Sequence, residues 1–327
     1  MDANNLSINM ELRKRSYGFC DLINTRVKLI RCISGSVVGI WSAYIFPLLS
    51  VLTITFNLVL FYILIKKGSQ LPRHVIYMFW IFTCGVLTDV FVGWLWLFPT
   101  RGLPRASNGK LFFSIFSLSP SACRLHRFFY SLTSTMTCNL LVVSAMDRLL
   151  TVCFPRYFRK RLHFYAWYSC GVTLIISIIT ILPFAIMINW YDDQYRIQCW
   201  VPKRFAVLHT LVSNFGPIQT TILIILNVAL LICTRCGDRK QNSQEPLESI
   251  DHENEVTISV YILSGTYALI AIPQSIAYII LRVSTLKMSN TMEEIIFDIA
   301  HYTWCLNSLR QIIDFVVFMK YFKALKE

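Results

Sequence analysis

Several charged residues lie within stretches of sequence that are otherwise largely apolar. They are Asp89, the adjacent pair Asp147-Arg148, Arg310 and Asp314. An ionised side chain at the centre of a membrane helix costs roughly 2.5–3.5 kcal/mol, so such residues are expected to face the interior of a helix bundle and to pair there. No nucleophile-base or metal-ligand spacing accompanies them. The chemistry that they predict is ion pairing inside a bundle, with no enzyme activity and no cofactor.

The composition indicates an integral membrane protein. Of the 327 residues, 55% are hydrophobic and only 15% are charged, whereas soluble domains average roughly 45–50% and about 25%. The formal net charge is nevertheless +13. A basic balance often indicates nucleic-acid binding, but these charges lie between long apolar runs. We therefore expect membrane lipids, and no nucleic acid, as their surroundings.

Seven segments are long and apolar enough to cross a bilayer, which takes about 20 residues. The sequence therefore predicts an all-α membrane protein, a seven-transmembrane helix bundle over residues 39–318. An extracellular tail (1–38) precedes it, and a short cytoplasmic end (319–327) with an amphipathic helix follows it. The third segment is the most polar, so we expect it inside the bundle. The seven segments are 39–65, 75–98, 125–150, 165–188, 206–233, 256–281 and 295–318.

Charge counting leaves the orientation of the chain open. With the N terminus outside, the inner stretches hold 14 Lys and Arg and the outer stretches hold 16, whereas the positive-inside rule requires a clear excess on the inner side. The sequon Asn5-Leu6-Ser7 favours an outside N terminus, with Asn5 glycosylated. Motifs must decide the rest.

An ordered set of spaced residues carries a family resemblance. Asp147-Arg148 closes the third segment, Cys123 lies 25 residues before Arg148, and Cys199 precedes the fifth segment. Asn57, Asp89, Trp167, Pro217 and Pro273 occupy the first, second, fourth, fifth and sixth segments in turn. This pattern resembles the rhodopsin-like family of G-protein-coupled receptors, from residue 39 to 322. The resemblance implies a receptor in the plasma membrane with its N terminus outside.

The cysteines divide into expected bridges and expected thiols. The resemblance implies a disulfide between Cys123 and Cys199, which would tie the third helix to the second outer loop. Cys20 and Cys32 are also extracellular in this topology, and they either pair with each other or remain thiols. Cys153 is interpreted as a small packing residue, and Cys233 as a plain thiol near the inner membrane edge, with lipidation as an alternative.

The resemblance also implies a switch at the inner membrane edge. Arg148 would be held by Asp147 and by Glu253 at the inner end of the sixth helix, and their separation would open a cleft for a G protein. Glu253 could equally be one of several solvated charges. In the same family the Asp89 position belongs to a polar, sodium-sensitive cluster, and we expect Thr133 and Thr137 to join it, with sodium near Asp89.

The seventh segment departs from the family's Asn-Pro-x-x-Tyr motif. One register aligns Gln311 to Phe315 with it, and the other aligns Asp314 to Phe318. We prefer the second, because Asp314 must face the bundle. Arg310 then lies one turn earlier on the same face and can pair with Asp314. The expected switch residues are thus Asp89, Asp147, Arg148, Glu253, Pro273, Asp314 and Phe318.

The predicted pocket lies in the outer halves of the helices. Tyr130 stands where amine receptors carry Asp, which argues against an amine ligand, and no Lys in the seventh segment could anchor retinal. Arg127 would supply a cation among aromatic walls, which suits a peptide or a lipid acid, and the basic outer stretches favour an acidic peptide. The expected ligand-binding residues are Arg127, Tyr130, Ser134, His209, Ser213, Gln274, Tyr278, Trp304 and Asn307.

Three classes of function follow from these patterns. The first is a receptor that converts binding of an extracellular ligand into activation of a heterotrimeric G protein. The second is a binding or scaffold protein with the same fold and no signalling, which is favoured by the unusual residues at the family's relay positions: Leu149, Ile225, Tyr267 and Ala271. The third, a transporter, is disfavoured because the sequence shows no repeated halves.

Overall fold

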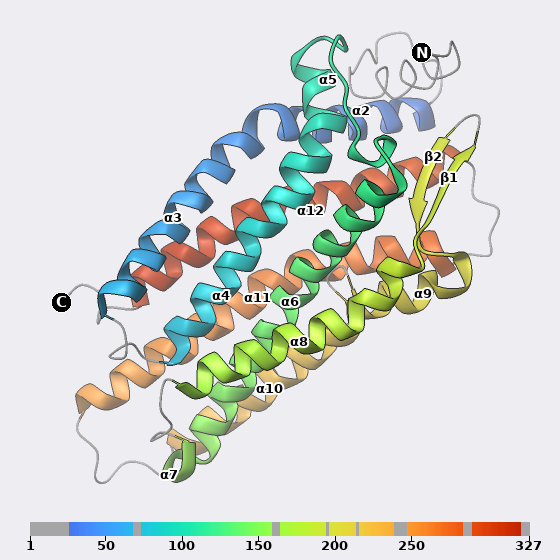
Figure 1. Ribbon diagram of the computed structural model, residues 1–327. Helices are drawn as coiled ribbons and strands as arrows, with labels where there is room; N and C mark the ends of the chain where they lie inside the picture. Colours follow the sequence, from blue (N-terminus) through green and yellow to red (C-terminus); the bar gives the residue numbers. More distant parts are fainter. Residues whose placement is uncertain are drawn as a thin grey trace.

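The computed structural model describes residues 26–67, 73–158, 164–193, 196–213, 216–238, 247–283 and 290–321. Long helices run roughly side by side through this part of the chain (Figure 1). Six helical stretches within it are long and apolar enough to cross a membrane. They are Cys32–Lys66, Arg73–Ala106, Pro120–Cys153, Phe164–Ile186, Arg204–Arg235 and Val256–Leu281.

The seventh helix of the bundle is α12 (Asn290–Tyr321), which is long enough to span but less hydrophobic. Arg310 and Asp314 lower its hydropathy, and both side chains are buried. The helix packs against α2 (Arg26–Ile40), α3 (Phe46–Lys67) and α11 (Leu247–Val283). It therefore completes the predicted seven-helix bundle, and neighbouring helices satisfy the polar groups on its inward face.

The first two membrane passages are bent at proline. α2 and α3 are joined by a π-helical segment, η1 (Trp41–Ile45), which ends two residues before Pro47. In the second passage, α4 (Arg73–Thr88) continues as the π-helix η3 (Asp89–Gly102), which contains Pro99, and ends in α5 (Leu103–Ala106). Proline removes a backbone donor and displaces the carbonyl one turn earlier, which accounts for the irregular helix at these places. The first helix begins at Arg26, so part of the predicted tail is helical.

The central helix is α6 (Pro120–Cys153), which packs against α4, α8 (Phe164–Ile186) and α10 (Pro217–Asp238). Ser119 caps its start by accepting a hydrogen bond from the Ala122 N–H, and Pro120 occupies the first turn. The helix ends before α7 (Pro155–Phe158). The hydroxyl residues in its middle are buried, as the sequence predicts for the third segment: Ser131, Thr133, Ser134, Thr135 and Thr137.

A small β-hairpin was not expected from the sequence. β1 (Asn189–Asp193) pairs antiparallel with β2 (Arg196–Trp200) and follows α8. The fifth passage is also divided, into α9 (Lys203–Val212) and α10, with the break just before Pro217. The bundle thus has a hairpin end, which carries β1 and β2, and an α7 end on the opposite side (Figure 1).

The surface of the bundle is apolar and its interior is partly polar. Leu58 and Ile65 on α3, Ile179 on α8 and Leu269 on α11 are at least 62% exposed. By contrast, Asp89 and Gln274 are buried. This distribution is the reverse of that in a water-soluble domain and fits a protein surrounded by lipid.

Candidate functional site

The hairpin end is held by the predicted disulfide between Cys123 and Cys199. Their Cα atoms are 6.0 Å apart, and both residues are buried. The bridge joins the first turn of α6 to β2 and packs against Phe184 and Ile188. Arg124 donates from Nε to the Ile188 carbonyl (3.3 Å), which fixes the same loop on α6. The structure confirms this prediction.

Arg127 lies inside the bundle at this end, one turn along α6 from the disulfide. Its guanidinium carbon is 4.8 Å from the ring centre of Phe116, 5.2 Å from that of Trp96 and 5.5 Å from that of Tyr130. The whole residue is only 8% exposed. A cation over aromatic faces is stabilised by the ring quadrupoles, the more so when it is withdrawn from water. We call these four residues the Arg127 cage.

Aromatic contacts extend the cage across the bundle to α12. The ring of Trp304 lies 5.1 Å from that of Tyr130, and the ring of His301 lies 4.8 Å from that of Trp96. The Tyr130 hydroxyl lies beside the side chains of Tyr278 and Trp304. Four predicted ligand-binding residues, Arg127, Tyr130, Tyr278 and Trp304, therefore come together.

Three residues of this region were missed by the sequence analysis. His301 lies one helical turn before Trp304, and Trp96 lies two turns after Asp89, so helical spacing from predicted residues could have found both. Phe116 lies in the short helix η4 (Ile115–Ser117), where no periodic pattern exists to indicate it. Within the described part of the chain, neither ring nitrogen of buried His301 has a hydrogen-bond partner.

The other predicted ligand-binding residues lie elsewhere. His209 contacts Ser131 (3.5 Å between Nε2 and Oγ) and the ring of Phe184, and Ser213 donates to the His209 carbonyl (2.6 Å). Ser134 donates to the backbone within α6. Gln274 is fully buried in α11, and neither atom of its amide is hydrogen-bonded to another described residue. Asn307 accepts a hydrogen bond from Arg310 and belongs to a separate polar network, which includes Asp89 and Asp314.

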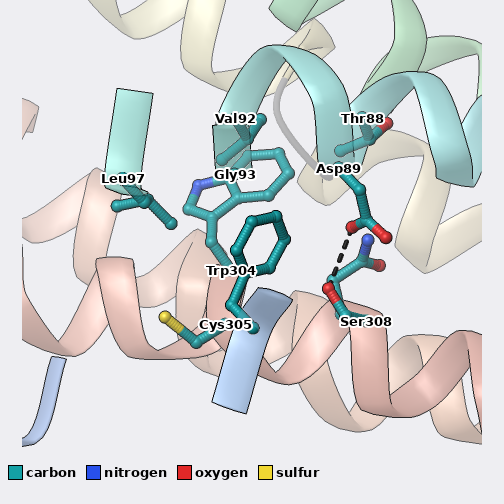
Figure 2. Close-up of a pocket in the computed structure, with 10 residues that line it drawn as sticks. Thr88, Asp89, Val92, Gly93, Leu97, Trp304, Cys305 and Ser308 are labelled. Atoms are coloured by element: carbon teal, nitrogen blue, oxygen red, sulfur yellow. Dashed lines mark hydrogen bonds between the residues drawn. The ribbon is translucent and has the colours of Figure 1, made fainter. Parts of the chain in front are cut away.

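A small cavity lies between the Arg127 cage and that network. Figure 2 shows Trp304 and Leu97 on one side of it and Asp89 and Ser308 on the other. Its volume is about 10 Å³, which is the lower limit for one water molecule. Gly93 also lines it, and a side chain at this position would meet the ring of Phe46.

Asp89 is held by hydrogen bonds from two helices, α3 and α12. Its carboxylate accepts hydrogen bonds from Ser308 Oγ (2.9 Å), Thr53 Oγ1 (3.1 Å) and Gln311 Nε2 (3.3 Å). Thr133 and Thr137, which were expected here, instead donate to backbone carbonyls within α6. That expectation is wrong because a threonine hydroxyl in a helix can satisfy itself on the preceding turn.

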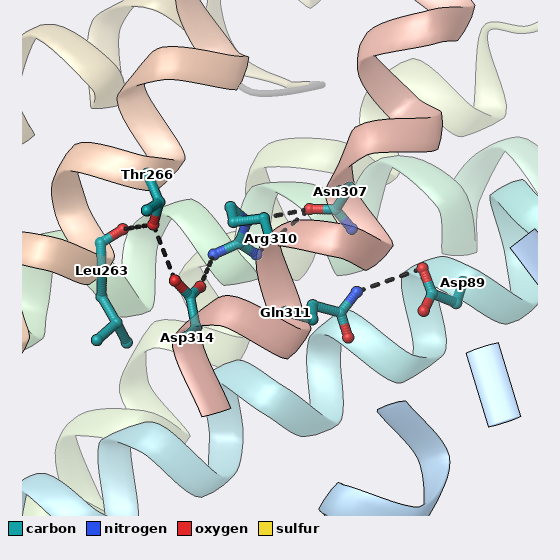
Figure 3. A network of polar contacts seen from close by, with 7 residues as sticks. All are labelled: Asp89, Leu263, Thr266, Asn307, Arg310, Gln311 and Asp314. Atoms are coloured by element: carbon teal, nitrogen blue, oxygen red, sulfur yellow. Dashed lines mark hydrogen bonds and ion pairs between the residues drawn. The ribbon is translucent and has the colours of Figure 1, made fainter. Parts of the chain in front are cut away.

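A buried ion pair continues this network along α12 (Figure 3). Arg310 pairs with Asp314, as predicted from their spacing, and also donates to Asn307 Oδ1 (3.3 Å). Thr266 of α11 donates to the other carboxylate oxygen of Asp314 (2.8 Å). The guanidinium lies 5.6 Å from the ring centre of Tyr267. The pair therefore joins the middle of α11 to α12.

Asp89, where the resemblance implies a sodium ion, already has hydrogen-bond donors on its carboxylate. Two hydroxyls and an amide NH₂ donate to the carboxylate, and the oxygen of Asn307 is engaged by Arg310. The amide NH₂ of Gln311 cannot ligate a cation, and an ion at the carboxylate would have to compete with all three donors. In the described residues no group of three or more His, Cys, Asp or Glu gathers as a metal site either.

At the α7 end, Asp147 pairs with Arg73 of α4. Arg73 Nη1 lies 2.9 Å from Asp147 Oδ1, and Nη2 donates to the Phe158 carbonyl (2.9 Å). Arg73 and Asp147 are 74 residues apart in the sequence, so no local pattern indicates their contact. Arg148 is 8% exposed and follows Asp147 on α6. The side chain of Glu253 lies outside the described residues, so its pairing with Arg148 stays a prediction.

A second disulfide lies at this end, between Cys153 of α6 and Cys233 of α10. Their Cα atoms are 6.2 Å apart, within the range that a disulfide requires. The prediction of two plain thiols is therefore wrong. It failed because partners 80 residues apart on two helices cannot be matched from sequence. Cys32 is also disulfide-bonded, and its predicted partner Cys20 lies outside the described residues.

Comparison with known protein families decides the assignment. The sequence model of the 7 transmembrane receptor (rhodopsin family) matches residues 102–314, well over half of the chain. The chain belongs to the rhodopsin family of receptors. The matched range covers α6 to most of α12 and therefore includes both disulfides, Arg127 and Arg148. No curated protein matches the sequence significantly.

Two of the relay residues named from the sequence, and the predicted switch residue Phe318, lie in the interior of the bundle. Tyr267 is fully buried in α11 beneath Arg310, and Ala271 is fully buried one turn later, before Pro273. Phe318 is fully buried and contacts the ring of Phe82. The receptor thus has an ion pair in the region where the sequence analysis placed the family's relay. The predicted glycosylation site Asn5 and the C-terminal amphipathic helix lie outside the described residues.

Proposed function

We propose that this receptor binds an anionic ligand at the hairpin end and activates a heterotrimeric G protein at the α7 end. The hairpin end is extracellular in this proposal, and the protein lies in the plasma membrane with its N terminus outside. The favoured ligand is an acidic peptide. No catalytic step is part of the function.

The observation that carries the proposal is the Arg127 cage. A guanidinium withdrawn from water attracts a carboxylate more strongly than an exposed one does, since the interaction is less screened. The hydroxyl of Tyr130 in the cage, and the ring of His301 next to it, can add hydrogen bonds. With the N terminus outside, the outer stretches also hold more basic than acidic residues, so that an anionic ligand is steered toward this end.

Contacts between described residues supply a route from the cage to the ion pair in the middle of the bundle. Trp304 contacts Tyr130 of the cage and lines the cavity that also reaches Asp89. Asp89 connects through Gln311 and Ser308 to the stretch of α12 that holds Arg310. A ligand that displaces Trp304 therefore acts on the helix whose ion pair joins α11 and α12. Such a ligand would shift the balance between two arrangements of these helices.

The test compares two arginines on the same helix. Panels of acidic and basic peptides are applied to cells that express the receptor with G-protein sensors, and the concentration for half-maximal activation is recorded. Arg127→Gln is expected to raise that concentration for the active acidic peptide at least about tenfold, which corresponds to about 1.4 kcal/mol. Arg124→Gln is the matched control, because Arg124 lies one turn earlier and is exposed.

Two results would overturn parts of the proposal. A clear preference for basic peptides would contradict the anionic ligand. If no G protein responded to any ligand pool, the non-signalling binding or scaffold protein would be the better description. One observation favours that alternative: the buried Arg310–Asp314 pair ties α11 to α12 at the level of Tyr267.

A further inference from the structure

The two disulfides on α6 lie on opposite sides of the membrane. Cys123 and Cys153 belong to one continuous helix, Pro120–Cys153, and are 30 residues apart. At 1.5 Å per residue this separation is about 45 Å, whereas the hydrocarbon core of a bilayer is about 30 Å thick. A helix that spans the membrane therefore places its two cysteines beyond opposite faces.

One of the two disulfides must consequently face the cytosol, whichever way the chain is inserted. The cytosol keeps most thiols reduced, and disulfides that form there are usually transient or regulatory. Cys123 and Cys199 are buried under the hairpin, whereas Cys153 and Cys233 are only partly buried at the end of the bundle. The orientation in the proposed function places Cys153 and Cys233 on the cytosolic side.

We propose that Cys153 and Cys233 form a reversible redox site that joins α6 to α10 at the cytoplasmic end and lowers G-protein activation when oxidised. The oxidant is a low-molecular-weight disulfide such as oxidised glutathione. One cysteine thiolate attacks it, forms a mixed disulfide and releases one small thiolate. The second cysteine thiolate then displaces the other small thiolate. Two protein thiols become one disulfide, one small disulfide becomes two small thiols, and the protons pass to the released thiolates.

The position of the bridge gives it a mechanical effect. Cys153 lies five residues after Arg148, and Cys233 is followed by Thr234, which lies against Tyr261 of α11. The bridge therefore spans the region where α6, α10 and α11 converge at the α7 end. A cleft for a G protein at this end requires the helix ends to separate. The oxidised bridge holds two of them together, and the reduced form releases them.

The first experiment measures the bond without any G protein. The purified full-length receptor is equilibrated with glutathione buffers from fully oxidised to the reduced ratio of the cytosol, free thiols are alkylated, and both disulfides are quantified by mass spectrometry. The fraction of receptor that carries the Cys153–Cys233 bond is expected to fall at least about fivefold between these limits, while Cys123–Cys199 stays intact. A Cys153–Cys233 bond that never forms, or that resists reduction as fully as Cys123–Cys199, would overturn the redox site.

The second experiment measures the effect of the bond. Hydrogen exchange of the ends of α6 and α10 is compared in oxidised and reduced receptor, and faster exchange is expected after reduction. Basal nucleotide exchange on a reconstituted G protein is expected to fall at least about twofold on oxidation. Cys153→Ser/Cys233→Ser is expected to lose both responses, whereas Cys170→Ser, which removes a buried free thiol, keeps them.

These readouts separate failure of the redox site from failure of the proposed function. If oxidation changes neither hydrogen exchange nor nucleotide exchange, the regulatory role is wrong even though the bond forms. If the receptor activates no G protein in either form, the proposed function is wrong, and the bond and hydrogen-exchange measurements still decide the redox site.

Discussion

Arg310 and Asp314 form an ion pair in the interior of the bundle, with side chains that are 2% and 1% exposed. They lie one turn apart on α12, and Thr266 of α11 completes the arrangement by donating to Asp314. Taking both charges out of water is costly, and only the pairing and the added hydrogen bonds offset that cost. The pair therefore fixes how α12 faces α11.

Removal of either charge is expected to destabilise the receptor strongly. Arg310→Gln or Asp314→Asn leaves the other charge buried without its partner, which typically costs about 3–5 kcal/mol. Replacing both together is expected to cost clearly less than the sum of the single changes. Thermal unfolding of the purified receptor in detergent measures all three variants. Strictly additive losses would show that the two residues do not stabilise each other.

Sodium is expected to have no specific effect on this receptor. The Asp89 carboxylate already accepts three hydrogen bonds, so a cation would have to displace donors to reach it. Unfolding midpoints in sodium chloride and in N-methylglucamine chloride of equal ionic strength are expected to agree within about 1 °C. A sodium-dependent stabilisation that disappears in Asp89→Asn would contradict this prediction and restore the ion to the site.

Two glycine-to-alanine changes are expected to act in opposite directions. A Cβ atom at Gly93 would lie 2.0 Å from the nearest atom of the Phe46 ring, so Gly93→Ala must displace that ring, at a cost of roughly 1–3 kcal/mol. A Cβ atom at Gly171 in α8 meets nothing within 4 Å, and Gly171→Ala is expected to stabilise its helix by up to about 1 kcal/mol. Unfolding midpoints measure both. Equal effects would mean that the space around Gly93 is not filled as described.

The disulfide at the hairpin end is expected to stabilise the receptor substantially. Cys123→Ala opens a bridge between residues 76 apart, and loss of such a bridge costs roughly 2–5 kcal/mol. Cys170→Ala removes a buried free thiol of similar size and serves as the control. Surface expression and unfolding midpoints are expected to fall much more for Cys123→Ala. Similar losses in both variants would indicate that packing, and not the bridge, is responsible.

The sequence was sufficient for features that depend on composition or on spacing along one helix. Six of the seven predicted apolar segments overlap helical stretches that can cross a membrane, and the four-residue spacing of Arg310 and Asp314 predicted their pairing. The family resemblance correctly implied Cys123–Cys199. α12 illustrates the limit of hydropathy alone, because a helix inside the bundle can carry charges that a lipid-facing helix cannot.

Features that depend on contacts between distant segments could not be predicted. Arg73 reaches Asp147, and Cys153 reaches Cys233, only because the three helices α4, α6 and α10 pack in a particular arrangement. Thr133 and Thr137 of α6 donate their hydroxyl hydrogen bonds to carbonyls of the same helix. Their polarity correctly indicated that they are buried, but it did not indicate these partners. The Arg127 cage was identified only by its arginine and one of its rings, because Phe116 lies in an irregular segment.

The measurement that tests the account most directly is nucleotide exchange on a panel of purified G proteins by the receptor reconstituted in lipid. The receptor is expected to accelerate exchange on at least one of them in the presence of an acidic peptide pool. Arg148→Gln is expected to reduce that acceleration at least about tenfold, whereas Arg235→Gln, which changes an exposed arginine at the same end, is expected to keep it. Acceleration that is equal in all three forms, or absent from all three, would contradict the account.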